Sequence, residues 1–444
     1  MPSTDAAEIG SHILASPYAK RQLHTQPSRR KTNGSSLKPH ISVLVSRTDL
    51  VDDPEFHPPE HHPVNPTGYY HLPQSIPPFE FESRKLVLPE SIQGKIDIVR
   101  IPSSRVPTKI LPVAATDAVS TTMEPPKDPS ILKYWKQRRR LFSKFDLGIQ
   151  LDQEGWFSVT PEQIADHVAT ETLENIRSKE PQPVVVLDAF GGCGGNSIAF
   201  AKRPDVGKVI SVDIDRQRLK LAAQNASIYG IPKDKLIFVE CNAVFILQFC
   251  YRAGAFVLDQ PVQDGEHIMQ MMAAMPPPVN SESCHGYTIG GIDELPRNID
   301  LVFMDPPWGG VDYNCVFGKN GYSLQDNMRI RRLHPQQQQE QVADAFFDSF
   351  SPSNQHERKA AFNSGLDETN CVNGSELLAF AAAAAPYVVY DIPKNTNRSS
   401  LAQAALDAGY RGNCRLDEHY LNGRLKTVSA YFGVDWGELL GTDV

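Results

Sequence analysis

Short apolar runs of strand length alternate with helical segments between residues 183 and 304. Such runs occur at residues 184–187, 209–212 and 299–304, and β-branched residues dominate the first two. Runs that are apolar on both faces are typical of parallel strands, because helices cover both faces of a parallel sheet. The alternation therefore predicts an α/β fold built on a parallel sheet.

The expected elements continue to residue 432. Seven strands are predicted, at residues 183–188, 208–213, 235–240, 299–304, 387–391, 411–420 and 425–432. Helices are predicted at residues 196–203, 215–229, 243–251 and 401–408. Asn422-Gly423 separates the last two strands and favours a two-residue type I′ turn, so the sheet should end in an antiparallel hairpin. Upstream, Thr160 is expected to cap a helix that has Pro161 at its first position and Gln163 closing a capping box.

A glycine-rich turn follows the first of these strands. It reads Asp188-Ala189-Phe190-Gly191-Gly192-Cys193-Gly194-Gly195-Asn196, and the next strand ends in Asp213. Glycines allow the backbone to approach a ligand, and an acid at the end of the second strand suits ribose hydroxyls. Ser197 stands where a dinucleotide fingerprint needs its third glycine, and no Gly-Lys-Ser/Thr occurs in the chain. The turn therefore favours an adenosine ligand other than a dinucleotide.

Asp305-Pro306-Pro307-Trp308 follows the strand at residues 299–304. A carboxylate and the Pro306 carbonyl can accept the two hydrogens of a planar amine, and Trp308 offers a ring face. A Pro-Pro turn with a packed tryptophan is the structural alternative. Together with the glycine turn and Asp213, the motif indicates methyl transfer from S-adenosylmethionine to an amine at the end of the fourth strand.

The composition divides the chain. More than half of the 35 prolines precede Ser130, and residues 1–125 are expected to be a mostly disordered tail because such sequence buries little apolar surface. Residues 126–180 should form a helical extension that closes the active site, and residues 181–434 the core. Residues 253–297 and 333–372 lack the alternation and are predicted surface insertions, and residues 435–444 a tail.

Charge and cysteine content exclude several classes. The net charge of −8 argues against indiscriminate nucleic-acid coating, so RNA contact should be local. Residues 133–145, which are basic and aromatic, are the candidate; a solvated helix face is the alternative. Seven cysteines without Cys-x-x-Cys speak against zinc and a disulfide framework, and no metal is expected. No signal peptide or membrane-length apolar run is present, so an intracellular soluble protein is expected.

With these motifs in place, the chain resembles the trimethylguanosine synthase family, which converts 7-methylguanosine RNA caps to 2,2,7-trimethylguanosine. The resemblance covers roughly residues 131–434 outside the insertions. Its most specific part is Trp156-Phe157-Ser158-Val159-Thr160-Pro161-Glu162. It implies a class I S-adenosylmethionine-dependent methyltransferase whose seven-stranded sheet ends in an antiparallel hairpin, with a small helical N-terminal extension.

The resemblance also implies roles for single residues. Asp305 and Pro306 would orient the guanine N2 amine, and Trp308 would stack on the cationic 7-methylguanine ring. The residues implied to contact the cap phosphates are Tyr313, Lys394 and Lys426. Those implied to hold S-adenosylmethionine are Thr160, Asp188, Phe190, Gly192, Gly194, Asp213 and Asn242. Transfer should be direct, with Asp305 positioning the amine rather than acting as a base, because some relatives carry serine there.

Partners and alternatives complete the expectations. The resemblance implies capped snRNA- and snoRNA-type substrates, nuclear or nucleolar residence with a cytoplasmic pool, and a monomer that contacts basic tails of ribonucleoprotein partners. The departures are Gln150, where relatives can carry lysine, Lys394 in place of arginine, and Asn242 in place of an acid. A class I enzyme acting on adenine N6 or guanine N2 inside rRNA or tRNA remains open. An inactive RNA-binding module is the second alternative.

Overall fold

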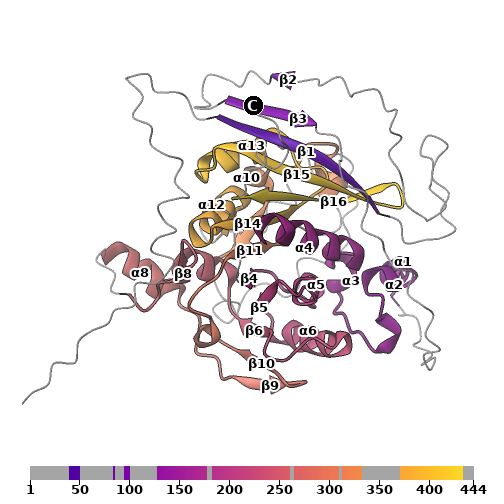
Figure 1. Ribbon diagram of the computed structural model, residues 1–444, viewed down its shortest axis with the longest axis vertical. Helices are drawn as coiled ribbons and strands as arrows, with labels where there is room; N and C mark the ends of the chain where they lie inside the picture. Colours follow the sequence, from indigo (N-terminus) through magenta and orange to yellow (C-terminus); the bar gives the residue numbers. More distant parts are fainter. Residues whose placement is uncertain are drawn as a thin grey trace, which may run out of the picture. The chain divides into compact units, whose positions relative to one another are not determined.

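A mixed sheet organises the protein (Figure 1). The computed structural model describes residues 40–50, 84–85, 95–100, 128–177, 183–260, 265–309, 313–332 and 371–433, which all fall in the compact unit Lys38–Val444. Among these residues the sheet has twelve strands in the order β2-β3-β1-β15-β16-β14-β11-β4-β5-β6-β10-β9. Their bounds are β1 His40–Leu50, β2 Arg84–Lys85, β3 Lys95–Arg100, β4 Val184–Asp188, β5 Val206–Asp213, β6 Leu236–Glu240, β9 Glu282–Cys284, β10 Tyr287–Gly290, β11 Leu301–Met304, β14 Tyr387–Ile392, β15 Gly412–Leu421 and β16 Arg424–Phe432.

The seven predicted strands are contiguous in this sheet. They run from β15 through β16, β14, β11, β4 and β5 to β6. The pairs between β14, β11, β4, β5 and β6 are parallel, and β16 runs antiparallel to both β14 and β15. Asn422 and Gly423 have φ of 49° and 71°, the left-handed backbone that a type I′ turn requires. The α/β fold with a terminal hairpin is therefore confirmed.

Helices cover both faces of the sheet. One hydrophobic cluster holds α4 Glu162–Arg177, α5 Gly195–Ala201 and α6 Arg216–Tyr229 against one face. The cluster on the other face holds α12 Gly374–Ala384, α13 Arg398–Asp407 and the π-helix η3 Ile246–Cys250. The remaining described elements are α1 Pro129–Trp135, α2 Arg138–Leu141, η2 Phe145–Leu147, α3 Gly155–Ser158, α7 Ala243–Phe245, β7 Tyr251–Arg252, β8 Ala255–Phe256, α8 Gly265–Ala274, η4 Ile292–Glu294, α9 Tyr313–Phe317, α10 Leu324–Asn327, β12 Arg329–Arg331 and β13 Cys371–Asn373.

Local signals explain the helix ends. The Asp215 side chain accepts from the backbone N–H of Gln217 at the start of α6, and Gly230 ends that helix at φ 71°. Asn373 and Glu376 form a capping box at the start of α12. The box predicted at Thr160 is wrong: α4 begins at Glu162, and the Thr160 hydroxyl bonds elsewhere.

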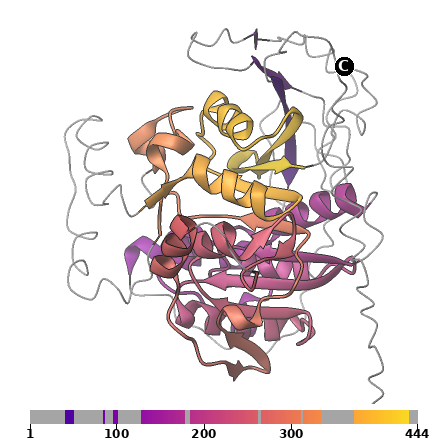
Figure 2. The same ribbon diagram turned by 90° about the vertical axis from the view of Figure 1, so that its left-hand side faces the viewer.

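Both edges of the sheet extend beyond the prediction. β1 pairs in parallel with β15, and β3 pairs with β1, although no element was expected before residue 126. Figure 2 shows indigo β1 beside the yellow strands of the hairpin. At the opposite edge β10 pairs in parallel with β6, so part of the predicted insertion 253–297 belongs to the sheet. The apolar side chains of Ile41, Val43 and Val45 are buried, which explains why β1 is held there.

The remaining boundary expectations stay predictions. Most of insertion 333–372, all of the tail 435–444 and much of residues 1–125 lie outside the described residues. Across the described part of the chain, no helix is both long and apolar enough to cross a membrane.

Candidate active site

Four acids lie where parallel strands end. Asp188 and Asp213 are the last residues of β4 and β5, Asp305 directly follows β11, and Asp391 is the second-to-last residue of β14. Because β14, β11, β4 and β5 are consecutive parallel neighbours, the acids gather at one edge of the sheet. In open α/β sheets this edge is where ligands bind. The sequence predicted three of these acids as site residues and missed Asp391.

The glycine turn forms an open cradle above β4 and β5. Gly192 has φ 50°, and no atom lies within 4 Å of the place a Cβ would occupy. Gly194 has φ 90° and precedes α5, while a Cβ on Gly191 would meet the Ser211 hydroxyl at 2.0 Å. The backbone of this turn therefore requires glycine and leaves room in front of Gly192, which fits an adenosine cofactor.

Asp213 fixes the cradle from the neighbouring strand. Its Oδ2 accepts from the Gly192 N–H over 3.0 Å, and its Oδ1 accepts from the Asp215 N–H over 2.8 Å. Burial raises the pKa of Asp213, and these backbone hydrogen bonds oppose the shift. Each oxygen keeps a second lone pair, so the carboxylate can still accept from ribose hydroxyls.

Asp188 lies beneath the cradle. Its side chain is completely buried. It accepts one hydrogen bond from the Ser197 hydroxyl over 2.5 Å and another from the backbone N–H of Phe190 over 3.4 Å. Burial raises the pKa of Asp188 to about 7. The structure thus places Asp188 as a support that ties the turn to α5.

Asp305 accepts hydrogen bonds from two other segments of the site. Its Oδ2 accepts from the Thr160 hydroxyl over 3.0 Å and from Nδ2 of Asn196 over 3.4 Å. Burial raises the pKa of Asp305 to about 7; the hydrogen bond from Thr160 opposes the shift, and the charge of Asp188 adds to it. Burial and the charge of Asp305 also raise the pKa of Asp391. Three carboxyl groups in one low-dielectric region cannot all ionise without cost, so their proton affinities rise together.

An aromatic group follows Asp305. The Trp308 and Tyr313 rings meet edge to face, with centroids 5.5 Å apart, and Tyr313 meets Tyr322 in the same way at 6.2 Å. The Tyr322 hydroxyl donates to the Trp308 carbonyl over 3.2 Å. Trp308 is half-buried, and its indole N–H finds no acceptor among the described residues. Pro306, which joins this group to Asp305, is buried.

The two predicted lysines lie on neighbouring segments at the same edge. Lys394 follows β14 and Lys426 is near the start of β16, and both are half-buried. The Thr427 hydroxyl donates to the Ile392 carbonyl over 3.2 Å, which joins the two segments. The Tyr322 N–H donates to the Asn395 carbonyl over 3.1 Å, which links Lys394's loop to the aromatic group.

The helical extension covers the glycine turn. A Cβ on Gly195 would meet Cγ2 of Val159 at 3.0 Å and the Phe142 ring at 3.8 Å. The Tyr134 ring of α1 meets Phe157 of α3 edge to face at 5.2 Å. Val159 and Phe142 therefore lie against the glycine turn, and closure of the active site by the extension stays a prediction.

Asn242 has a structural role in the described residues. Its Oδ1 accepts from the Val244 N–H over 2.8 Å and caps α7. Its Nδ2 donates to the Arg331 carbonyl over 2.9 Å, which anchors β12. The amide thus links two segments that follow β6, and its contact with adenine stays a prediction.

Two polar contacts escaped the sequence reasoning. Thr160 and Asn196 meet Asp305 only after the chain folds, since they are 145 and 109 residues from it. Asn196 lies in the glycine turn and Asp391 lies near the end of a strand, so the position of each was a weak signal. The local pattern predicted Thr160 as a helix cap and gave no sign of its hydrogen bond to Asp305.

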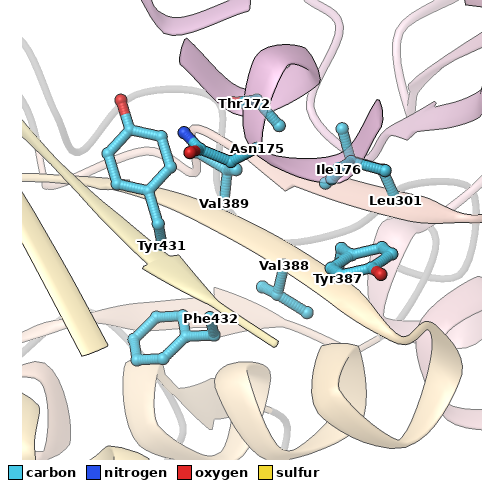
Figure 3. Close-up of a pocket in the computed structure, with 9 residues that line it drawn as sticks. All are labelled: Thr172, Asn175, Ile176, Leu301, Tyr387, Val388, Val389, Tyr431 and Phe432. Carbon is cyan, nitrogen blue, oxygen red and sulfur yellow. The ribbon is translucent and has the colours of Figure 1, made fainter. Parts of the chain in front are cut away.

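A small cavity lies elsewhere (Figure 3). Side chains of α4, such as Thr172, and residues at the amino ends of β11 and β14, such as Leu301 and Tyr387, line it. Its free volume of about 10 Å³ holds roughly one water molecule. Asp305 lies at the carboxyl end of the same sheet, so this cavity is separate from the candidate site.

Comparison with known proteins agrees with this geometry. Residues 184–435 match the family model described as RNA cap guanine-N2 methyltransferase. Trimethylguanosine synthase of Schizosaccharomyces pombe is 35% identical over 202 residues, which is 46% of this chain and 62% of the relative. The Saccharomyces cerevisiae protein of the same name is 41% identical over 109 residues, 24% of this chain and 33% of the relative. The chain thus spans less than two thirds of either relative.

Solved methyltransferase structures are more distant. A SAM-dependent methyltransferase from Agrobacterium tumefaciens has 12% identity, covers 62% of this chain and 63% of its own, and gives a TM-score of 0.30. The METTL16 methyltransferase domain has 9% identity, covers 65% and 75%, and gives 0.32. Because the family model covers more than half of the sequence, the chain belongs to the RNA cap guanine-N2 methyltransferase family.

Proposed function

We propose that this protein transfers methyl groups from S-adenosylmethionine to the N2 amine of 7-methylguanosine RNA caps. The family supports the reaction class, and one observation carries the assignment of the site. Asp305, held by Thr160 and Asn196, lies at the end of β11, directly before Trp308 and beside the carboxyl end of β4. A hydrogen-bond acceptor for an amine, an aromatic ring and the glycine turn therefore lie together at the carboxyl ends of these parallel strands.

The backbone of the glycine turn and one carboxylate would bind the cofactor. The Gly192–Gly194 turn and Asp213 would hold the adenosine part of S-adenosylmethionine, and the segment that ends in Thr160 would cover it. Bound S-adenosylmethionine supplies an electrophilic methyl group. The protein would exclude water from this region through the contacts of Val159 and Phe142 with the turn.

Positioning of the amine would fall to Asp305 and the Pro306 carbonyl. The guanine N2 lone pair is delocalised into the ring, so the amine is a weak nucleophile. Holding it in line is then the main contribution that the protein can make, and well-oriented reactions gain several orders of magnitude in rate. Trp308 would select the methylated ring, because a cationic ring on indole gains about 0.5–2 kcal/mol. Tyr313, Lys394 and Lys426 would bind the cap phosphates.

The decisive experiment is a methyl-transfer assay with the purified chain. Labelled S-adenosylmethionine should methylate 7-methylguanosine diphosphate and triphosphate, and GTP should remain unmodified. Mass spectrometry of the product tells one transfer from two. Equal activity on GTP, or activity on rRNA or tRNA instead of the cap nucleotide, would replace this proposal with the broader amino-methyltransferase assignment.

Cellular features are proposals of the same standing. They are nuclear residence with a cytoplasmic pool, a monomeric state and contact with basic tails of ribonucleoprotein partners. The family supports nuclear residence, and the acidic composition suits contact with basic tails. Imaging of a tagged full chain tests the first. Sedimentation of the protein alone and with such a tail peptide tests the other two.

A further inference from the structure

A basic surface lies on α1 and α2. Residues 128–146 contain six basic and two acidic residues, although the whole chain carries a net charge of −8. Lys133, Lys136 and Arg139 are exposed there. Clustering of positive charge on one short segment of an acidic protein favours a local anionic partner rather than general solubility.

This surface begins close to the candidate site. Lys133 precedes Tyr134, and its Nζ lies 4.7 Å from the centroid of that ring. The Tyr134 ring meets the Phe157 ring edge to face, with centroids 5.2 Å apart. Thr160, which follows Phe157 in the same segment, donates to Asp305 over 3.0 Å. A short series of contacts therefore joins Lys133 to the acid that precedes Trp308.

The charges differ in how they are held. Arg139 has 72% of its side chain exposed and pairs with Asp146 at 2.5 Å, and Arg138 also bonds Asp146 and lies over the Trp135 ring. Among the described residues, Lys133 and Lys136 have no carboxylate partner. They are three residues apart on or just after α1, so they project from one side of the helix. Two unpaired ammonium groups on one face can bind successive phosphates.

We propose that Lys133 and Lys136 bind backbone phosphates of the RNA that follows the cap. The proposal rests on the proposed function, since it takes the cap site as the point where the RNA begins. The contact is with phosphates and carries no sequence preference. It would make a capped RNA a better ligand than the free cap nucleotide, with an advantage that salt weakens.

The test measures binding of the full chain to two fluorescent probes, 7-methylguanosine triphosphate and a capped single-stranded RNA of about twelve nucleotides, between roughly 50 and 200 mM salt. The variant is Lys133→Glu/Lys136→Glu. The matched control is Lys208→Glu/Lys233→Glu, which makes the same charge change at the amino ends of β5 and β6, opposite the site. Thermal melting of both variants checks the fold.

The expected result is loss of RNA binding alone. Affinity for the capped RNA should fall at least about tenfold at low salt, and the slope of log K against log salt should drop by roughly 1.4, or 0.7 per single-strand contact. Nucleotide affinity and the control should stay within about twofold of the unaltered protein. Lys136→Glu alone, which leaves the Tyr134 contact in place, should give about half the change in slope.

Two results would overturn the inference. An equal loss for the nucleotide would place the lysines in the cap site itself, and unchanged RNA affinity would leave them as solvated surface residues. The proposed function fails separately. A protein that binds capped RNA through these lysines but transfers no methyl group would contradict the enzyme assignment and support the RNA surface.

Discussion

The Thr160 hydroxyl donates a 3.0 Å hydrogen bond to Oδ2 of Asp305. Thr160 directly follows Val159, which contacts the glycine turn, and Asp305 directly follows β11, so this contact joins the covering segment to the candidate amine site. Asn196 donates to the same oxygen and links the glycine turn as well. The Asp305 carboxylate therefore links the covering segment, the glycine turn and the end of β11 through hydrogen bonds to one oxygen.

The substitution Thr160→Val should shift the pH dependence of turnover. The hydrogen bond favours the ionised form of Asp305, so its loss should raise the pKa of that carboxyl by about one unit, or roughly 1.4 kcal/mol. The profile of kcat against pH should shift to higher pH by the same amount. Thr172→Val is the matched control, because the Thr172 hydroxyl is buried in α4 and donates to the Val168 carbonyl instead. An identical profile for both variants would show that Thr160 does not act on Asp305.

Turnover of the unaltered protein should rise with pH through about 7. Only the ionised carboxylate can accept from the amine without competing for its own proton, and burial raises the pKa of Asp305 to about 7. Below that pH the group holds a proton and activity falls. Asp305→Asn should lower kcat and flatten the profile between about pH 6 and 8. A profile that keeps its shape in this variant would assign the titration to Asp188 or Asp391.

Trp308→Ala should strongly reduce activity and spare cofactor binding. The lost ring contributes a cation–π interaction of up to about 2 kcal/mol and an edge-to-face pair with Tyr313 of about 1 kcal/mol, which together correspond to roughly a hundredfold in kcat/KM. Calorimetry with S-adenosylmethionine should give a near-normal Kd. Trp308→Phe keeps a ring face and should retain part of the activity. Loss of cofactor binding in Trp308→Ala would indicate a structural role for the tryptophan.

Deleting residues 1–120 should destabilise the protein, contrary to what the proline-rich composition indicates. The deletion removes β1, which pairs with β15 along ten residues and buries Ile41, Val43, Val45 and Leu50. Each such side chain contributes about 1.5–3 kcal/mol, so several kcal/mol of stability should be lost. Deleting residues 1–37 keeps β1 and is the control. Equal melting temperatures for the two truncations would show that β1 adds nothing to the fold.

Acid should weaken the fold through a buried histidine on β15. His419 is fully buried beside Asp417, and burial lowers its pKa to about 4. The unfolded chain binds a proton there below about pH 6.5 and the folded protein does not, so stability is complete above 6.5 and declines toward pH 4. The pKa of Asp417 is lowered too, so its contribution is lost at still lower pH.

The measurement is urea unfolding at pH 7, 5.5 and 4.5. His419→Asn should lose the part of the pH dependence that lies between 6.5 and 4, on the order of 3 kcal/mol. His285→Asn, at an exposed turn position with φ 52°, is the control. If both variants follow the pH dependence of the unaltered protein, His419 is not the group that titrates.

The sequence by itself determined seven contiguous strands of the sheet and the placement of three acids at their carboxyl ends. Apolar runs with helices between them dictate parallel strands, and residues that directly follow such strands must gather at one edge. That reasoning placed Asp188, Asp213 and Asp305 together and set the hairpin at Asn422-Gly423, because each depends on neighbours in the chain. Local patterns carry this information since strand length, turn residues and helix caps act over a few residues.

Only the tertiary structure decided the partners. Thr160 had a good local use as a helix cap, yet it bonds Asp305, 145 residues away. β1 lies in proline-rich surroundings that argue against structure, yet β15 offers it an unpaired edge and a place for its apolar side chains. In both cases a long-range contact outweighs the local preference, because burying a group with its partner stabilises more than a cap or a loop does.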